Sequence, residues 1–500
     1  MASTRIPAEI FFLDRNSPRS LQAQIREVVV GSILSGLIHT GARMPSSRGL
    51  ARHLGIARMT VTLAYQELVA QGYLNAKDRS AYVVAEVESD QLARSADASA
   101  KPAGTVDWST FLAQPLRDRR AIRKRTDWRK FRYPFLYGQL DTRLFDRRAW
   151  RECLHQATGH RDFDDMAGDF VSADDPLLVT YIRTRTLPRR GISATSDEIL
   201  VTVGAQNALW LVVELLSRGP TPLRAVCENP GYPDTIHALR WCGADVTTVE
   251  VDDNGLPPQD IPPGTRAVFV TPSHQSPTGV TMRTTRRKDL LQKAAREDFV
   301  IVEDDYDAEM SFLAAPGPAL KSYDRAGRVL YVGSFSKVMF PGLRLGYLVG
   351  PAEIIAEARE LASMILRHPP GHLQRAAAYF LSLGHYDRQI RNMRSTYAAR
   401  QAALRAALAG TSLSIVETNV SGGSCLWVRG PDGLDSDRLA RALIEDSVLI
   451  EPGGPFFHGS DGPTEWFRLG YSSIEQDRIA PGVALIEERI QAMMTRGIGH

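Results

Sequence analysis

The residues best suited to chemistry lie in a short stretch, Ser334 to Gly346, which places one lysine close to two hydroxyls and an arginine. Lys337 carries an amine that can form a Schiff base with an aldehyde. Ser334, Ser336 and Arg344 carry the hydrogen-bond donors that a phosphate dianion needs. An aldehyde and a phosphate occur together in pyridoxal 5′-phosphate. The stretch therefore predicts a site for this cofactor, with Lys337 as its covalent partner.

Three more residues could hold the ring of such a cofactor. Asp304 follows the apolar run Phe299–Val302, where its carboxylate could pair with a protonated pyridine nitrogen and keep the ring electron-withdrawing. Tyr306 could reach the ring hydroxyl, and Tyr232 could stack on the face of the ring. Any one of these residues alone could be an ordinary surface or structural residue. The prediction depends on their occurring together.

The elements that must position these residues alternate between strands and helices. Strands are expected at 198–203, 225–227, 267–271, 299–302, 329–332 and 345–349, and a helix at 205–216. This alternation indicates an α/β domain with a largely parallel sheet and cofactor groups at the strand ends. Ala205 and Gln206 begin the expected helix, so their backbone N–H groups could hold the cofactor phosphate.

The composition narrows the class of protein. The chain has 500 residues, enough for one large domain and at least one small one. Its four cysteines, Cys153, Cys227, Cys242 and Cys425, lack CxxC spacing, which favours reduced thiols over disulfides or a metal cage. No apolar run is long enough for a membrane helix, and the first residues lack the pattern of a signal peptide. A cytoplasmic protein without a metal site is therefore expected.

The beginning of the chain predicts a second, smaller module. An amphipathic helix is expected to precede a short helix at 47–54, which ends at Gly55, and a longer helix at 57–71. Two helices joined by such a tight turn can place side chains in a major groove of DNA. Short strands are expected at 73–74 and 81–84, where they would form a wing.

Several side chains of this module are suited to DNA. The expected DNA-binding residues are Arg43, Ser47, Arg48, Arg58, Thr60 and Arg79. Arg58 and Thr60 lie at the front of the longer helix, and the other arginines could hold phosphates. Residues 1–85 hold 10 Lys and Arg against 5 Asp and Glu, although the whole chain has a net charge of only +3. This distribution favours a nucleic-acid contact.

The order of these motifs resembles a known family. The stretches 43–51, 54–55, 58–61 and 64–68 are similar to the GntR-type winged helix-turn-helix. The resemblance implies binding to double-stranded operator DNA. The chain departs from the family in the wing, where 77–80 replaces the usual glycine-rich turn. A small helical dimerisation module with surface arginines is the alternative interpretation.

A flexible linker is expected between the two modules. Residues 86–107 lose the hydrophobic periodicity and are rich in Ser, Ala, Asp and Lys. The basic run 117–130 could contact DNA or form a solvated helix face. The expected organisation is a DNA-binding domain at 1–85, a linker at 86–130 and an effector domain at 131–500.

The larger domain resembles a family as well. Residues 131–489 are similar to the fold-type I aminotransferases, and more closely to the aminotransferase-like body of the MocR regulators. The resemblance implies an α/β fold of the pyridoxal-phosphate-dependent transferases with a small C-terminal α+β subdomain. It also implies that Arg468 binds a substrate or effector carboxylate, and that Tyr137 and Gly138 border the effector pocket. Arg468 could instead form a structural salt bridge.

Two departures from these families bear on the effector. Aminotransferases touch the ring hydroxyl with an asparagine, but Ser276 stands in that place, which favours sensing over turnover. The GABA-sensing relative has an arginine where this chain has Asp234. Because a carboxylate at that position would repel GABA, another amino compound is expected, such as a ligand with a second amine.

The sequence thus predicts a transcriptional regulator that depends on pyridoxal 5′-phosphate. It would sense an amino acid, an amino sulfonate such as taurine, or an ectoine-derived diamine through an external aldimine formed at the expense of Lys337. The resemblance also implies a homodimer with exchanged DNA-binding heads. The alternatives are an active aminotransferase with a DNA-binding head and a regulator of vitamin B6 genes that senses the cofactor itself.

Overall fold

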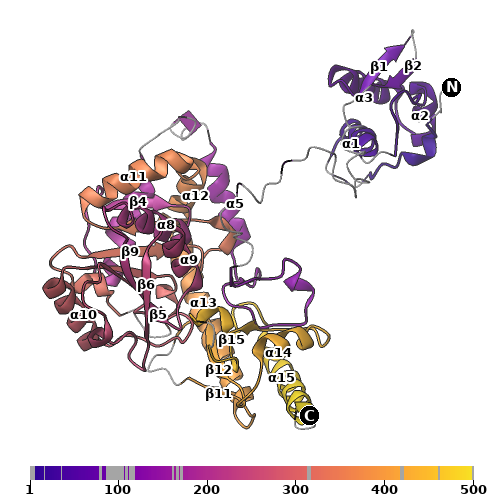
Figure 1. The fold of residues 1–500 in the computed structure, drawn as a ribbon. Coiled ribbons are helices and arrows are strands. Elements are labelled where there is room, and N and C mark those ends of the chain that lie inside the picture. The colour runs from indigo at the N-terminus through magenta and orange to yellow at the C-terminus, as the bar shows by residue number, and fades with distance from the viewer. Residues whose placement is uncertain are drawn as a thin grey trace. The chain divides into compact units, whose positions relative to one another are not determined.

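The computed structural model describes residues 6–15, 17, 19–34, 37–77, 81–85, 106, 111, 119–159, 163–164, 168, 173–311, 317–416, 422–459 and 462–497. The chain forms two compact units, residues 1–115 and 116–500, each with its own hydrophobic core (Figure 1). Of the helices in these described ranges, none is long and apolar enough to cross a membrane.

The first unit is a small helical module with a two-stranded antiparallel sheet. Its elements are α1 (Leu21–Leu34), α2 (Ser47–Leu54), α3 (Arg58–Ala70), β1 (Leu74–Lys77) and β2 (Ala81–Val84). Helix α2 begins where the Ser46 hydroxyl accepts a hydrogen bond from the Gly49 N–H at 3.1 Å. It ends at Gly55, whose φ of 64° is in the left-handed region. The predicted helix, turn and helix are confirmed.

Tyr65 fixes helix α3 within this unit. Its buried hydroxyl donates a hydrogen bond to the Pro45 carbonyl at 3.1 Å, and its ring packs edge-to-face on Tyr82 of β2 at 4.9 Å. Helix α3 is thereby held against both the start of α2 and the wing. The tip of the wing, which includes Arg79, lies outside the described residues.

The second unit contains a seven-stranded sheet in the order β4-β10-β9-β8-β7-β5-β6. The strands are β4 (Ile199–Thr202), β5 (Arg224–Asn229), β6 (Asp245–Glu250), β7 (Ala267–Val270), β8 (Val300–Asp305), β9 (Val329–Ser334) and β10 (Gly346–Val349). Strands β5 to β9 pair in parallel, whereas β10 is antiparallel to both neighbours. The predicted, largely parallel sheet is confirmed. Strand β10 can reverse direction because it follows β9 without a crossover helix.

Helices cover both faces of this sheet (Figure 1). They include α8 (Ala205–Leu216), α9 (Pro233–Trp241), α10 (Thr284–Glu297), α11 (Ala352–Leu366) and α12 (Gly371–Ser382), and α5 (Arg147–Ala157) and α7 (Pro176–Tyr181) pack beside α12. Val302 of β8 packs in the same core as α8, whereas its neighbour Ile301 packs in the same core as α10. Successive side chains of a strand point to opposite faces, so β8 is buried from both sides.

The C-terminal part of the second unit forms the predicted α+β subdomain. Its sheet has the order β11-β12-β15-β14, made of Ser414–Ile415, Cys425–Arg429, Trp466–Gly470 and Glu451–Pro452. Helices α13 (His385–Leu408), α14 (Ser436–Leu443) and α15 (Gln476–Gly497) accompany it (Figure 1). A short parallel pair joins β3 (Tyr133–Pro134) to β13 (Val448–Leu449), so the beginning of the unit lies against its end.

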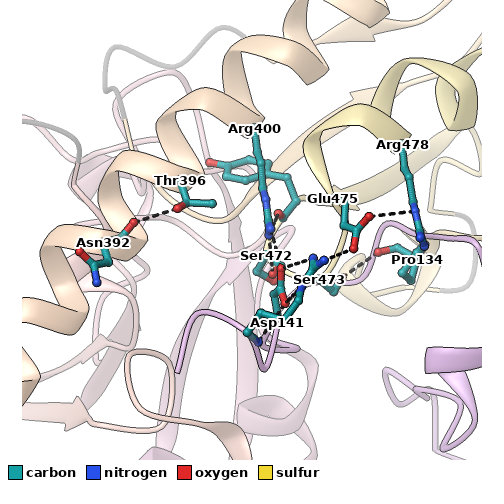
Figure 2. Close-up of polar contacts among 11 residues, drawn as sticks. Pro134, Asp141, Asn392, Thr396, Arg400, Ser472, Ser473, Glu475 and Arg478 are labelled. Atoms are coloured by element: carbon teal, nitrogen blue, oxygen red, sulfur yellow. Dashed lines mark hydrogen bonds and ion pairs between the residues drawn. The ribbon is translucent and has the colours of Figure 1, made fainter. Parts of the chain in front are cut away.

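A buried ion pair fastens the segment after β3 to this subdomain (Figure 2). Arg400 of α13 donates to the Asp141 carboxylate at 2.6 Å and to the Ser472 carbonyl at 3.1 Å. Burial alone would raise the pKa of Asp141, but hydrogen bonds from Arg143 and Arg400 lower it to about 2. The Ser473 hydroxyl donates to the Pro134 carbonyl at 2.7 Å. The segment 134–141 is therefore held at both ends.

Candidate functional site

A cavity of about 230 Å³ lies where β8 and β9 end and α8 begins. The residues predicted from sequence to bind the cofactor all line it: Ala205, Gln206, Tyr232, Asp304, Tyr306, Ser334, Ser336, Lys337 and Arg344. Tyr137 and Arg468 line the same cavity, and Gly138 lies beside the Lys337 amine. The structure thus brings together residues that are far apart in the sequence.

Lys337 lies in the connection between β9 and β10, and its amine faces an aromatic ring. The Nζ atom is 4.3 Å from the centre of the Tyr137 ring. The φ of 66° at Gly138 favours glycine, and a Cβ atom there would come within 2.6 Å of this Nζ and displace the amine. Burial, followed by the positive charge of Lys124, lowers the pKa of Lys337 to about 8. A neutral, nucleophilic amine is therefore accessible near physiological pH.

Asp304 lies near the end of β8 with a carboxylate that lacks a partner. Its Oδ1 atom is buried and makes no hydrogen bond with any described residue. Burial, followed by the charge of Asp305, raises the pKa of Asp304 to about 7. A buried acceptor of this kind is suited to a cationic N–H donor, such as a protonated pyridine nitrogen.

The opposite end of the cavity can receive an anion. Helix α8 begins after Gly204, which has no side chain to cap the first N–H groups, those of Ala205 and Gln206. A Cβ atom at Gly204, whose φ is 80°, would lie 3.3 Å from the Arg344 guanidinium carbon, so glycine lets the arginine approach the helix. The buried Ser336 hydroxyl has no partner among the described residues. These donors fit a phosphate dianion.

Two tyrosines of the cavity already have hydrogen-bond partners. The Tyr232 hydroxyl donates to Gln206 Oε1 at 2.6 Å. The Tyr306 hydroxyl donates to the His274 carbonyl at 2.8 Å, which leaves its oxygen able to accept a hydrogen bond. Ser276, the predicted departure from the aminotransferases, lines the cavity as well.

Arg468 forms a salt bridge and also lines the cavity. Its Nε donates to Glu451 Oε2 at 2.9 Å, and both side chains are buried. Its guanidinium carbon lies 4.2 Å from the centre of the Tyr137 ring and 4.7 Å from that of Phe456. Among the described residues its two Nη atoms have no hydrogen-bond partner. The arginine is thus ion-paired and also able to bind a ligand from the cavity wall.

Lys124 is a charged cavity residue that sequence reasoning missed. The interpretation of 117–130 as a DNA contact or a solvated helix face is wrong for this residue. The described residues 119–125 form no helix, and the Lys124 amine contacts the Tyr137 carbonyl and lies 3.3 Å from Glu451 Oε1. Trp128, which is 7% exposed, was the one signal in the run that these residues pack against a core.

The charge of Asp234 is partly balanced. Its Oδ2 lies 3.2 Å from the Tyr232 hydroxyl oxygen, the longer of that hydroxyl's two contacts, and Arg119 lies 3.8 Å from its Oδ1. Asp234 therefore presents less net negative charge to a ligand than the sequence alone suggested.

The first unit presents the predicted DNA-binding side chains at the start of α2 and α3. Arg58 is the first residue of α3, and its Nε donates to the Ser47 hydroxyl at 3.4 Å. Arg43 and Arg48 are exposed and Thr60 is half-buried. Because the preceding residue is an alanine, the first N–H groups of α3 have no side-chain cap. This helix end is suited to a phosphate.

Two family models match the chain. The model of the bacterial regulatory proteins of the gntR family matches residues 21–84. The model of the class I and II aminotransferases matches residues 180–486.

Individual relatives match over nearly the whole length. The HTH-type transcriptional regulator TauR of Rhodobacter capsulatus is 46% identical over 97% of this chain and 100% of its own. The probable rhizopine catabolism regulatory protein MocR of Rhizobium meliloti is 31% identical over 97% of each chain. Among solved structures, the α-aminoadipate aminotransferase LysN of Thermus thermophilus, in complex with N-(5′-phosphopyridoxyl)-L-leucine, matches with a TM-score of 0.69 and 27% identity. It covers 78% of this chain and 100% of its own.

These findings agree with the geometry of both units. The cofactor of the aminotransferase fold is pyridoxal 5′-phosphate, which the unpartnered Asp304 carboxylate, the Lys337 amine and the anion-binding end of the cavity fit. The GntR-type unit binds DNA. The chain therefore belongs to the MocR-type transcriptional regulators, in which a GntR-type helix-turn-helix domain is joined to a domain of the class I and II aminotransferases.

Proposed function

We propose that the second unit of this cytoplasmic regulator senses a small primary amine and thereby controls how the first unit binds its operator. The observation that carries the proposal is the Lys337 amine, buried beside Tyr137 and with a lowered pKa. Such an amine is suited to holding an aldehyde reversibly rather than to a structural ion pair.

The residues around Lys337 would each keep one part of the cofactor in place. Asp304 would hold the pyridine nitrogen, and Arg344, Ser336 and the start of α8 would hold the phosphate. The Tyr232 ring would cover one face. When bound, pyridoxal phosphate supplies an electrophilic carbon that reacts reversibly with primary amines. Lys337 would be the residue that holds this aldehyde in the absence of a ligand amine.

Sensing is favoured over turnover by the residue at position 276. By the family resemblance, the serine stands where the aminotransferases have an asparagine, so the longer amide side chain that would reach the ring hydroxyl is absent. A homodimer with exchanged heads, which the family resemblance implies, would let movement in the second unit change the spacing of two DNA-binding modules.

A titration of the visible absorption spectrum with primary amines tests the proposal, with and without a keto acid. A spectral shift that persists with one amine, together with a change in operator affinity, is the expected result. Transfer of the amino group to the keto acid at ordinary enzyme rates would support an aminotransferase instead. A response of operator affinity to pyridoxal phosphate alone would support a regulator of vitamin B6 genes.

A further inference from the structure

We propose that Lys124 determines effector specificity by binding, together with Arg468, an anionic group of the amine. The inference rests on the proposed function and narrows it to primary amines that carry a carboxylate or a sulfonate. Lys124 lies within residues 86–130, which the sequence assigned to the linker, and shortly before the predicted effector domain.

The position of Lys124 is fixed by its neighbours. Its amine donates to the Tyr137 carbonyl, lies 3.3 Å from Glu451 Oε1 and is 5.3 Å from the centre of the Tyr137 ring. Only 24% of its side chain is exposed. Arg468 binds the other oxygen of the same carboxylate. Lys124 and Arg468 therefore flank Glu451, and both line the cavity.

Lys124 and Arg468 together carry more positive charge than the carboxylate between them balances. The cofactor would engage Asp304 and Arg344, and Asp234 has Arg119 at 3.8 Å. Lys124 and Arg468 then share one carboxylate, that of Glu451. Burial would raise the pKa of Glu451, but Arg468 and Lys124 hold it below its usual value, so the carboxylate stays ionised. Two cations with one carboxylate leave one positive charge for a ligand anion to neutralise.

The segment that carries Lys124 is anchored independently of this charge cluster. The Arg120 carbonyl lies 3.0 Å from His237 Nε2, and the Arg120 guanidinium donates to the Gly459 carbonyl at 3.3 Å. Arg120 thus anchors the segment shortly before Lys124 through one backbone and one side-chain contact, without help from the lysine charge. Burial and the positive charge of Arg468 lower the pKa of Lys124, so keeping its amine protonated beside the cavity costs free energy. A bound anion would offset that cost.

Four amines that share a 2-aminoethyl unit test the inference: 2-aminoethanesulfonate, 3-aminopropanoate, 2-aminoethanol and 1,2-diaminoethane. Each is titrated into the full-length protein loaded with pyridoxal phosphate, and the visible spectrum reports binding. In the wild type, the sulfonate or the carboxylate is expected to bind at least about tenfold more tightly than the alcohol, as a charged hydrogen bond predicts. In Lys124→Met this preference should fall by about tenfold or more, and Lys124→Arg should restore most of it.

Lys130→Met is the matched control, because Lys130 is exposed on the same stretch and does not line the cavity. Its preference should equal that of the wild type. An equal loss for all four amines in Lys124→Met would mean that Lys124 only supports the fold, and would overturn the inference. So would a wild-type preference for the alcohol or the diamine, although that result would leave the proposed amine sensor intact. A wild-type spectrum that responds to none of the four would count against the sensor itself.

Discussion

Lys337 shows how a single buried residue can be kept reactive. Its amine lies 4.3 Å from the centre of the Tyr137 ring, and burial, with a smaller effect of the Lys124 charge, lowers its pKa and so favours its neutral form. Lys337→Ala is expected to abolish the spectral and operator response to any amine. Operator binding without effector should be retained, because the first unit has its own core. A gel-shift titration with and without amine checks this, and an unchanged amine response in the variant would contradict the assigned role.

The raised pKa of Asp304 leads to a prediction about how the stability of the protein depends on pH. Its folded pKa of about 7 lies above the ordinary value of 3.8, so burial stabilises its protonated form. In cofactor-free protein, that contribution is present at pH 4 and lost as the pH rises through about 7. Asp304→Asn should therefore raise the melting temperature of cofactor-free protein more at pH 8 than at pH 5, because at pH 5 the folded carboxyl is already largely protonated.

The cofactor should reverse this effect. A pyridinium donor would pair with the ionised Asp304, so the cofactor-loaded wild type should be more stable than the loaded Asn variant at pH 8. Thermal unfolding of both proteins at the two pH values, with and without pyridoxal phosphate, shows which of them is more stable in each state. If the Asn variant were still more stable than the wild type after cofactor loading, the carboxylate would not contact the cofactor.

At the scale of elements, the start of α3 is the predicted base-reading end. Arg58 begins this helix and is positioned by the Ser47 hydroxyl. Arg58→Ala is expected to weaken operator binding by about 1 to 3 kcal/mol if the guanidinium reads a base. Arg19→Ala is a suitable control, because Arg19 is exposed and pairs with Glu27. Fluorescence anisotropy on specific and scrambled DNA checks whether the loss is confined to the specific site.

The anchoring of segment 134–141 offers a second prediction at this scale. Arg400→Met would leave Asp141 buried with fewer partners, which should cost about 3 kcal/mol in the free energy of unfolding. Arg478 pairs with Glu475 in the same region at 3.1 Å but is largely exposed, so Arg478→Met should cost less than about 1 kcal/mol (Figure 2). Urea unfolding of both variants compares them, and equal losses would contradict the importance of the buried pair.

The parts of the fold that the sequence predicted correctly are those determined by local residue patterns. The strands β8 and β9 read as apolar runs because they are buried on both faces, and residues at their ends could be placed from that alone. Strand β6 was missed because it is an edge strand of mixed, partly exposed residues. Lys124 could not be found, because its partner Glu451 is brought near only by the complete fold.

At the scale of the whole molecule, the two units have separate cores, so the first should fold alone. Residues 1–115 expressed by themselves are expected to give a cooperative thermal transition by circular dichroism, because Ile25, Val29, Leu50 and Leu68 are fully buried within that unit. The fragment should bind operator DNA more weakly than the full chain if the second unit pairs two copies. Equal affinity of fragment and full chain would argue against such pairing.

The pairing of β3 with β13 also has a consequence for biosynthesis. A ribosome completes the first unit early, but Tyr137 cannot be held in place until Glu451, which accepts its N–H at 3.1 Å, has been translated. The nascent chain therefore carries a finished DNA-binding unit for most of the time during which its second unit is still incomplete. An mRNA truncated before the last hundred or so codons would yield a product whose DNA-binding unit is complete but whose second unit could not respond to any ligand.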